Sequence, residues 1–97
     1  MTDTFLDTIR TYCREIDYPR TKSQIFVHLL DEIDELDCEI EPESNPGPDG
    51  VFGESVDVIV CAFDLMFKER PDASNEEIIN YMIMKLEKWK TKYNNVE

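Results

Sequence analysis

Apolar residues recur every three or four positions through most of this 97-residue chain, which is the spacing of one face of an α-helix. The pattern predicts a first helix that contains Phe5 to Ile16 and is limited by Pro19, because the residue before a proline is driven out of helical geometry. It predicts a second helix from about Thr21 to Ile40. No segment alternates apolar and polar residues with the period of a strand over a convincing length, so the chain is predicted to be all-α.

The middle of the chain is divided by a proline- and glycine-rich stretch, Pro42 to Gly50, which is predicted to be a loop. A third helix is predicted from roughly Val51 to Glu69, with apolar residues on nearly every side. Such a helix needs burial all round, either in the middle of the domain or across a subunit interface.

A fourth helix is predicted from about Asn75 to Tyr93, since Ser74 followed by Glu77 is a capping-box signature. Its apolar stripe is expected to be buried and comprises Ile78, Ile79, Met82, Ile83, Leu86 and Trp89. The segments together predict a single domain, residues 1–97, folded as a four-helix bundle. The chain is short and its third helix is apolar on nearly every side, so we expect a homodimer or a homotetramer.

The charge balance narrows the choice of partners. The chain has 22 acidic and 10 basic residues, a formal net charge of −12. Binding to nucleic acid through its phosphates needs a positive surface, so nucleic acid is not an expected partner. An acidic chain is compatible with cations, with basic partners, or with phosphates carried in by a metal.

Cysteine usage and hydropathy bear on the compartment. The three cysteines have no CxxC spacing, so a disulfide framework or a zinc site is not expected and a reducing compartment fits best. The first residues lack a signal-peptide pattern. The longest apolar run, Val58 to Phe67, is interrupted by Asp64 and is too short to cross a bilayer. We therefore expect a cytoplasmic protein without a membrane partner.

Two pairs of acidic residues have a spacing that is compatible with a metal-binding site. Glu32 and Glu35 form an ExxE on the second predicted helix, and Glu54 and Asp57 form an ExxD on the third. Residues three apart share a helix face, so each pair can aim two carboxylates at one point. Both pairs border apolar surface, where carboxylates are unfavourable unless compensated. A divalent cation would compensate them, and an all-oxygen ligand set suits Mg²⁺ or Mn²⁺.

The alternative is that these acids are solvated helix faces, as acid-rich helices usually are, and spacing alone does not decide between the two. Within the second helix, position does add information. At about 100° per residue, Glu32 falls at the rim of the apolar arc and Glu35 outside it. Three other acids of this helix point further away, into solvent: Asp31, Asp34 and Asp37.

The two acid pairs, separated by 18 residues, resemble the signature of the MazG-type all-α nucleotide pyrophosphohydrolases, which is ExxE, a variable spacer and ExxD. The similarity covers about Thr21 to Tyr93, and the short chain is similar to the members carried by phages. The doublet that is often Glu-Glu in the family is Asp31-Glu32 here.

This resemblance implies Mg²⁺-dependent conversion of (deoxy)nucleoside triphosphates to monophosphates and pyrophosphate. It implies that Glu32, Glu35, Glu54 and Asp57 are the metal-binding and catalytic residues, in a four-helix fold. It also implies the host cytoplasm as the compartment if a phage encodes the chain.

Positive charge for the substrate phosphates is available on the fourth predicted helix. Lys85, Lys88 and Lys92 fall within about 60° of each other there. The family commonly has basic residues in this helix, so Lys85 and Lys92 are predicted substrate contacts. His28, one turn before Glu32 and on the same side, is a third. The alternatives are a solvated lysine face near a helix C-terminus and a structural histidine.

Two other functions compete with an enzyme. One is a small acidic helical protein that occupies a basic or nucleic-acid-binding partner, and the other is a plain dimerisation module. Net charge supports the first of these as well as it supports an enzyme. It does not explain why two acid pairs lie at helical spacing beside apolar surface.

Overall fold

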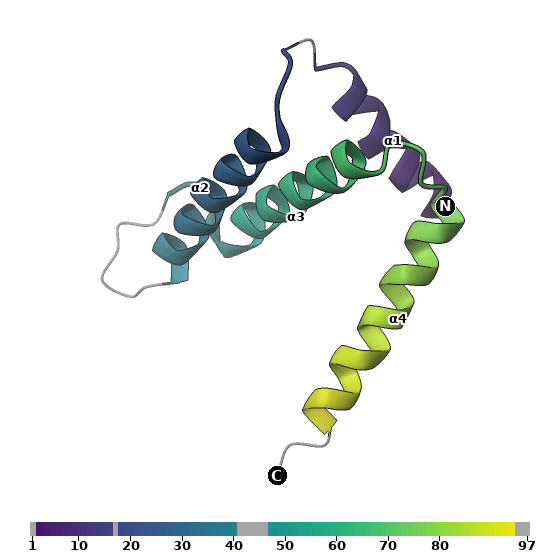
Figure 1. Ribbon diagram of the computed structural model, residues 1–97. Coiled ribbons are helices and arrows are strands. Elements are labelled where there is room, and N and C mark those ends of the chain that lie inside the picture. Colours follow the sequence, from purple (N-terminus) through teal and green to yellow (C-terminus); the bar gives the residue numbers. More distant parts are fainter. Residues whose placement is uncertain (1, 17, 41–46, 95–97) are drawn as a thin grey trace.

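The computed structural model describes residues 2–16, 18–40 and 47–94, and within these ranges it contains four α-helices and no strand (Figure 1). The helices are α1 (Thr2–Arg14), α2 (Lys22–Ile40), α3 (Gly50–Glu69) and α4 (Asn75–Asn94). The prediction of an all-α chain is confirmed. Most of the predicted loop lies outside the described residues, which resume at Gly47.

Side-chain caps explain where two of the helices begin. The Thr21 backbone N–H donates to Gln24 Oε1 at 2.8 Å, and the Gln24 N–H donates to Thr21 Oγ1 at 3.1 Å. This reciprocal capping box satisfies backbone donors at the start of α2. At α4 the Glu77 N–H donates to Ser74 Oγ at 3.1 Å, as the sequence predicts, while the Glu77 carboxylate accepts from Arg70 at 2.9 Å.

The main packing contact is between α2 and α3, which lie side by side and antiparallel (Figure 1). At its C-terminal end α3 also packs against α1, where Phe63 and Phe67 stack with ring centroids 6.0 Å apart. A small core forms there from α1, α3 and the start of α4, and comprises Leu6, Phe63, Phe67 and Ile78. This core fixes α3, and thereby the acids on its first turns.

Arg10 ties the start of α4 to α1. Its guanidinium donates to Asn75 Oδ1 at 2.7 Å and to the Ala73 carbonyl oxygen at 3.0 Å. The same group lies over the Phe67 ring, 4.9 Å from its centroid. Through Arg10, the Ala73 carbonyl and the Asn75 side chain are joined to Phe67 in the core. These contacts hold the turn between α3 and α4 in place.

Beyond its first turns α4 projects away from the other helices (Figure 1). Its backbone contacts α1 but neither α2 nor α3, so the four helices do not close into one bundle within a single chain. Every residue from 80 to 94 is exposed. The expected burial of Met82, Ile83, Leu86 and Trp89 is therefore wrong for the single chain. Periodicity identifies an apolar face but does not say which surface covers it.

The apolar third helix is also only partly covered. Cys61 and Phe63 are buried, whereas Val56, Ile59 and Val60 keep 44%, 51% and 46% of their surface exposed. Full burial of this helix, one of the two possibilities raised by the sequence, is not reached within one chain. Among the described residues, no helix has the length and hydropathy needed to span a membrane.

Candidate metal centre

Four carboxylates converge where the second half of α2 lies beside the first turns of α3. Glu32 and Glu35 come from α2, and Glu54 and Asp57 from α3. One oxygen of each can be chosen so that all lie within 4.8 Å of one another. The spacing of three residues places each pair on one helix face, and the antiparallel packing of α2 on α3 turns the two faces toward each other.

These carboxylates differ in their exposure to water. Glu54 is buried, with 8% of its surface exposed, Glu32 and Asp57 are half-buried, and Glu35 is exposed. Among the described residues, Glu32 Oε2 and Glu54 Oε2 are buried without a hydrogen-bond partner. An unpaired buried carboxylate oxygen is unfavourable, so the site is incomplete as a purely structural arrangement.

Burial and mutual repulsion alter the protonation of the site. Burial, followed by the charges of Glu35 and Asp57, raises the pKa of Glu54 to about 7. Burial, and then the neighbouring Glu35 carboxylate, also raises the pKa of Glu32. Both shifts have the sign expected where carboxylates are desolvated and crowded together without a compensating positive charge.

The donor set fits a hard divalent cation. The only basic residue paired with these acids in the described part of the chain is His28, whose Nε2 lies 3.1 Å from Glu32 Oε1. Four carboxylates supply oxygen ligands alone, which suits Mg²⁺ or Mn²⁺ and not a structural zinc site. A bound cation would also neutralise the repulsion and coordinate the two unpaired oxygens.

His28 has a second neighbour that the sequence did not predict. Its Nδ1 lies 3.8 Å from the Sγ of Cys61 on α3. Burial raises the pKa of the Cys61 thiol, which makes it a poor nucleophile. Helical spacing does place Cys61 one turn after Asp57, but its contact with His28 depends on the register of α2 against α3.

Asp64, a further turn along α3, is buried but already has a partner. Both of its oxygens accept hydrogen bonds from the Arg20 guanidinium, with Nη2 to Oδ1 at 3.0 Å. It therefore belongs to a structural ion pair and not to the unpaired cluster. No local pattern signals this pair, because Arg20 precedes α2 and lies 44 positions from Asp64 in sequence.

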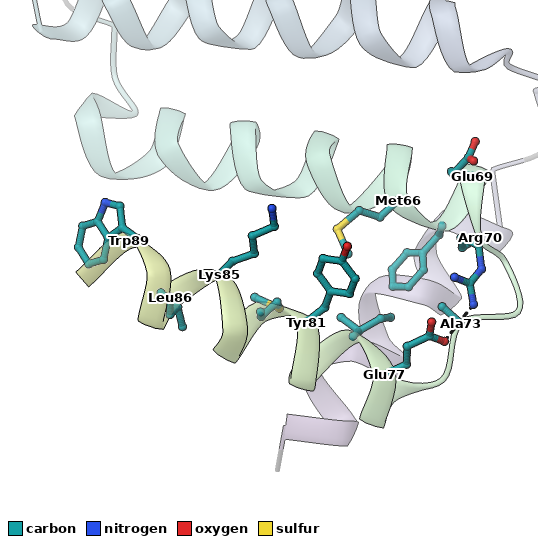
Figure 2. Close-up of a pocket in the computed structure, with 12 residues that line it drawn as sticks. Met66, Glu69, Arg70, Ala73, Glu77, Tyr81, Lys85, Leu86 and Trp89 are labelled. Atoms are coloured by element: carbon teal, nitrogen blue, oxygen red, sulfur yellow. Dashed lines mark hydrogen bonds and ion pairs between the residues drawn. The ribbon is translucent and has the colours of Figure 1, made fainter. Parts of the chain in front are cut away.

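The predicted substrate-binding lysines lie elsewhere. Lys85 and Lys92 are exposed on α4, which contacts neither α2 nor α3 through its backbone. Lys85 points into the gap between α4 and the C-terminal half of α3, with Nζ 6.0 Å from the ring centroid of Tyr81 (Figure 2). The structure thus brings His28 to the acids but does not bring the two lysines to them.

Comparison with known proteins found no match to this chain among protein-family models, curated proteins or solved structures.

Proposed function

We propose that this chain is a Mg²⁺-dependent nucleotide pyrophosphohydrolase that converts (deoxy)nucleoside triphosphates to monophosphates and pyrophosphate. The observation that carries the proposal is the cluster of Glu32, Glu35, Glu54 and Asp57, with two buried oxygens that lack a partner. The reaction itself is taken from the resemblance of the ExxE and ExxD motifs to the MazG-type family.

The proposed reaction adds one water across the phosphoanhydride bond between the α- and β-phosphates. That bond breaks, the water oxygen joins one of the two phosphorus atoms, and the products are the monophosphate and pyrophosphate. When bound, Mg²⁺ would supply positive charge to polarise the phosphoryl oxygens and acidify the water. The four carboxylates would hold the cation beside the phosphates and the attacking water.

A carboxylate of the cluster would accept the proton of the attacking water. A bound cation would lower the pKa of each carboxylate that coordinates it, so the proton acceptor would be a carboxylate that the cation does not fully engage. His28, which is exposed and paired with Glu32, would orient the Glu32 carboxylate or contact a phosphate.

Lys85 and Lys92 remain proposed contacts for the substrate phosphates. Because α4 contacts neither α2 nor α3 in one chain, they would reach the site only if α4 moves or comes from a second chain. Replacing Lys85 with Gln should raise KM more than it lowers kcat if this role is real.

The test is to incubate the pure protein with each nucleoside triphosphate and Mg²⁺ and to measure monophosphate and pyrophosphate. We expect Glu54→Gln and Asp57→Asn to abolish product formation. Asp34→Asn is the matched control, because Asp34 is an exposed acid of the same α2 helix outside the cluster. No product with any triphosphate, or activity unchanged in both site variants, would overturn the proposal.

The runner-up is an acidic helical protein that occupies a basic partner. It is favoured by the net charge of −12 and by the exposed row of Asp31, Asp34 and Asp37. Under this alternative, binding to the partner would depend on this exposed row of α2 more than on the four-carboxylate cluster. Neutralising that row would then weaken capture of a polycation, while Glu54→Gln would leave it unchanged.

A further inference from the structure

The second half of α4 has an apolar face that nothing in the described chain covers. Tyr81, Leu86 and Trp89 keep 59%, 57% and 60% of their surface exposed. A helix without tertiary contacts is marginal in water, and large contiguous apolar patches are rare on monomeric proteins. We therefore expect another molecule to cover this face of α4.

A groove lies beside that face, between α4 and the C-terminal end of α3. It has a volume of about 710 Å³, and its apolar walls are formed by Met66, Phe67, Ile78, Met82, Leu86 and Trp89. Figure 2 shows Met66 approaching from α3 while Tyr81, Lys85 and Trp89 extend from α4. Because α4 itself forms one wall, an occupant of the groove would also cover the exposed face of α4.

The charges on α4 are arranged so that the helix complements a second copy of itself. Its first turn is acidic, with Glu76 and Glu77, and its last turns carry Lys88, Lys90 and Lys92. At about 100° per residue, Glu77, Lys88 and Lys92 fall on one edge of the groove-facing surface. Two such helices side by side match opposite charges when antiparallel and oppose like charges when parallel. Antiparallel helix dipoles add to this preference.

We propose that a second copy of this chain covers the groove, with the two α4 helices packed antiparallel about a two-fold axis. An arrangement with Lys92 of the second copy opposite Glu77, which also accepts a hydrogen bond from Arg70, brings Trp89 of that copy beside Tyr81, which lines the groove. The two-fold axis makes the same contact twice and closes the assembly. This proposal is independent of any catalytic activity.

A second copy explains more of the surface than a small molecule would. A small ligand in the groove would leave Tyr93 exposed beyond Trp89, on which its ring packs at 5.5 Å between centroids. It would also leave Lys88 and Lys92, at the C-terminal end of α4, exposed. A partner helix as long as α4, about 30 Å for its 20 residues, covers both.

Sedimentation or light scattering of the full chain tests the proposal, and we expect a dimer. Trp89→Glu should raise the dimer dissociation constant by roughly 100-fold, because replacing a buried aromatic anchor with a charged residue is among the changes that weaken an interface most. The matched control is Ile83→Glu, which places the same charge on an exposed residue of α4 that does not line the groove. Far-UV circular dichroism establishes that both variants remain folded, as expected because neither residue contributes to the core.

Disulfide trapping tests the antiparallel orientation, in a Cys38→Ser background because Cys38 is the exposed cysteine. A mixture of Glu77→Cys and Lys92→Cys chains should form a cross-linked dimer on oxidation. Lys92→Cys alone should not, since two Lys92 positions lie at opposite ends of an antiparallel pair. Cross-linking of Lys92→Cys with itself but not with Glu77→Cys would overturn the proposed arrangement.

A wild-type chain that sediments as a monomer would overturn the proposal, even if its groove then takes up an apolar dye. So would a dimer that tolerates Trp89→Glu, or one that Ile83→Glu weakens to the same extent. A tetramer that Trp89→Glu splits into dimers would support it, because the groove is then one of the surfaces in use.

Discussion

Glu32 on α2 and Glu54 on α3 can place carboxylate oxygens within 4.8 Å of each other, and each also keeps one buried oxygen without a hydrogen-bond partner in the described chain. The closest helix pair of the fold therefore meets at a point of concentrated negative charge. Residues arranged in this way destabilise the metal-free protein while they favour a cation. The stability of the protein should therefore depend on bound metal and on pH.

Mg²⁺ should stabilise the folded chain, because the unfolded chain cannot hold the four carboxylates together. At a metal concentration 100 times Kd, the free energy of unfolding should rise by about 2.7 kcal/mol. For a chain of this size that is an increase in Tm of roughly 10–20 °C, measurable by circular dichroism. Asp57→Asn should lose the shift, whereas Asp34→Asn should keep it. An unchanged Tm at millimolar Mg²⁺ would contradict a four-carboxylate metal site.

Without metal, Glu54→Gln should make the protein more stable above pH 7. The substitution keeps the shape of the side chain and removes a buried charge that Glu35 and Asp57 repel. Thermal unfolding in the presence of a chelator measures the effect as a higher Tm. In Mg²⁺ the order should reverse, since the variant loses a ligand. A lower Tm for Glu54→Gln in both conditions would mean that the carboxylate is structural.

The metal-free protein should lose stability as the pH rises from about 5 to 7. The pKa of Glu54 is about 7 in the folded protein, above its ordinary value of 4.5. Between these values the folded state binds more protons than the unfolded chain, so the free energy of unfolding falls with increasing pH. The raised pKa of Glu32 acts in the same direction. Urea unfolding with a chelator at several pH values measures the slope, which Glu54→Gln should flatten.

The lower limit of that pH range matters because other carboxyls oppose the trend. Lys22 lowers the pKa of Glu69, and Arg70 lowers the pKa of Asp72. A carboxyl with a lowered pKa contributes stability above its ordinary pKa that is lost as the pH falls. Below about pH 4.5 stability should therefore decline again. A stability that rises steadily from pH 5 to 7 without metal would contradict the raised pKa of Glu54.

The helix boundaries could be predicted closely from the sequence because their signals are local. The second helix was expected from Thr21 and begins at Lys22, with Thr21 as its cap. The third was expected from Val51 and begins at Gly50, which has a φ of +70°, a conformation that glycine adopts readily. Such signals depend only on residues close in sequence, so they do not change with the tertiary packing.

What the sequence could not supply was the relation between helices. The spacing of Glu54 and Asp57 gives a shared face, but their meeting with Glu32 depends on the register of α2 against α3. The Cys61–His28 contact depends on that register as well. The direction in which α4 projects from the other helices depends on the turn that Arg10 holds. An apolar stripe ending in Trp89 looks the same in sequence whether its own chain or another molecule covers it.

The Arg20–Asp64 pair should contribute to stability because both side chains are largely buried, with 24% and 12% exposed. Asp64→Ala leaves the guanidinium without its partner, and we expect a loss of about 2 kcal/mol in the free energy of unfolding, measured in urea at constant pH. The double variant Arg20→Met/Asp64→Leu should recover most of that loss, since it removes both charges together. The exposed Lys22–Glu69 pair is the control, and Glu69→Gln should change stability little. A double variant no more stable than Asp64→Ala would show that the pair is not the source of the loss.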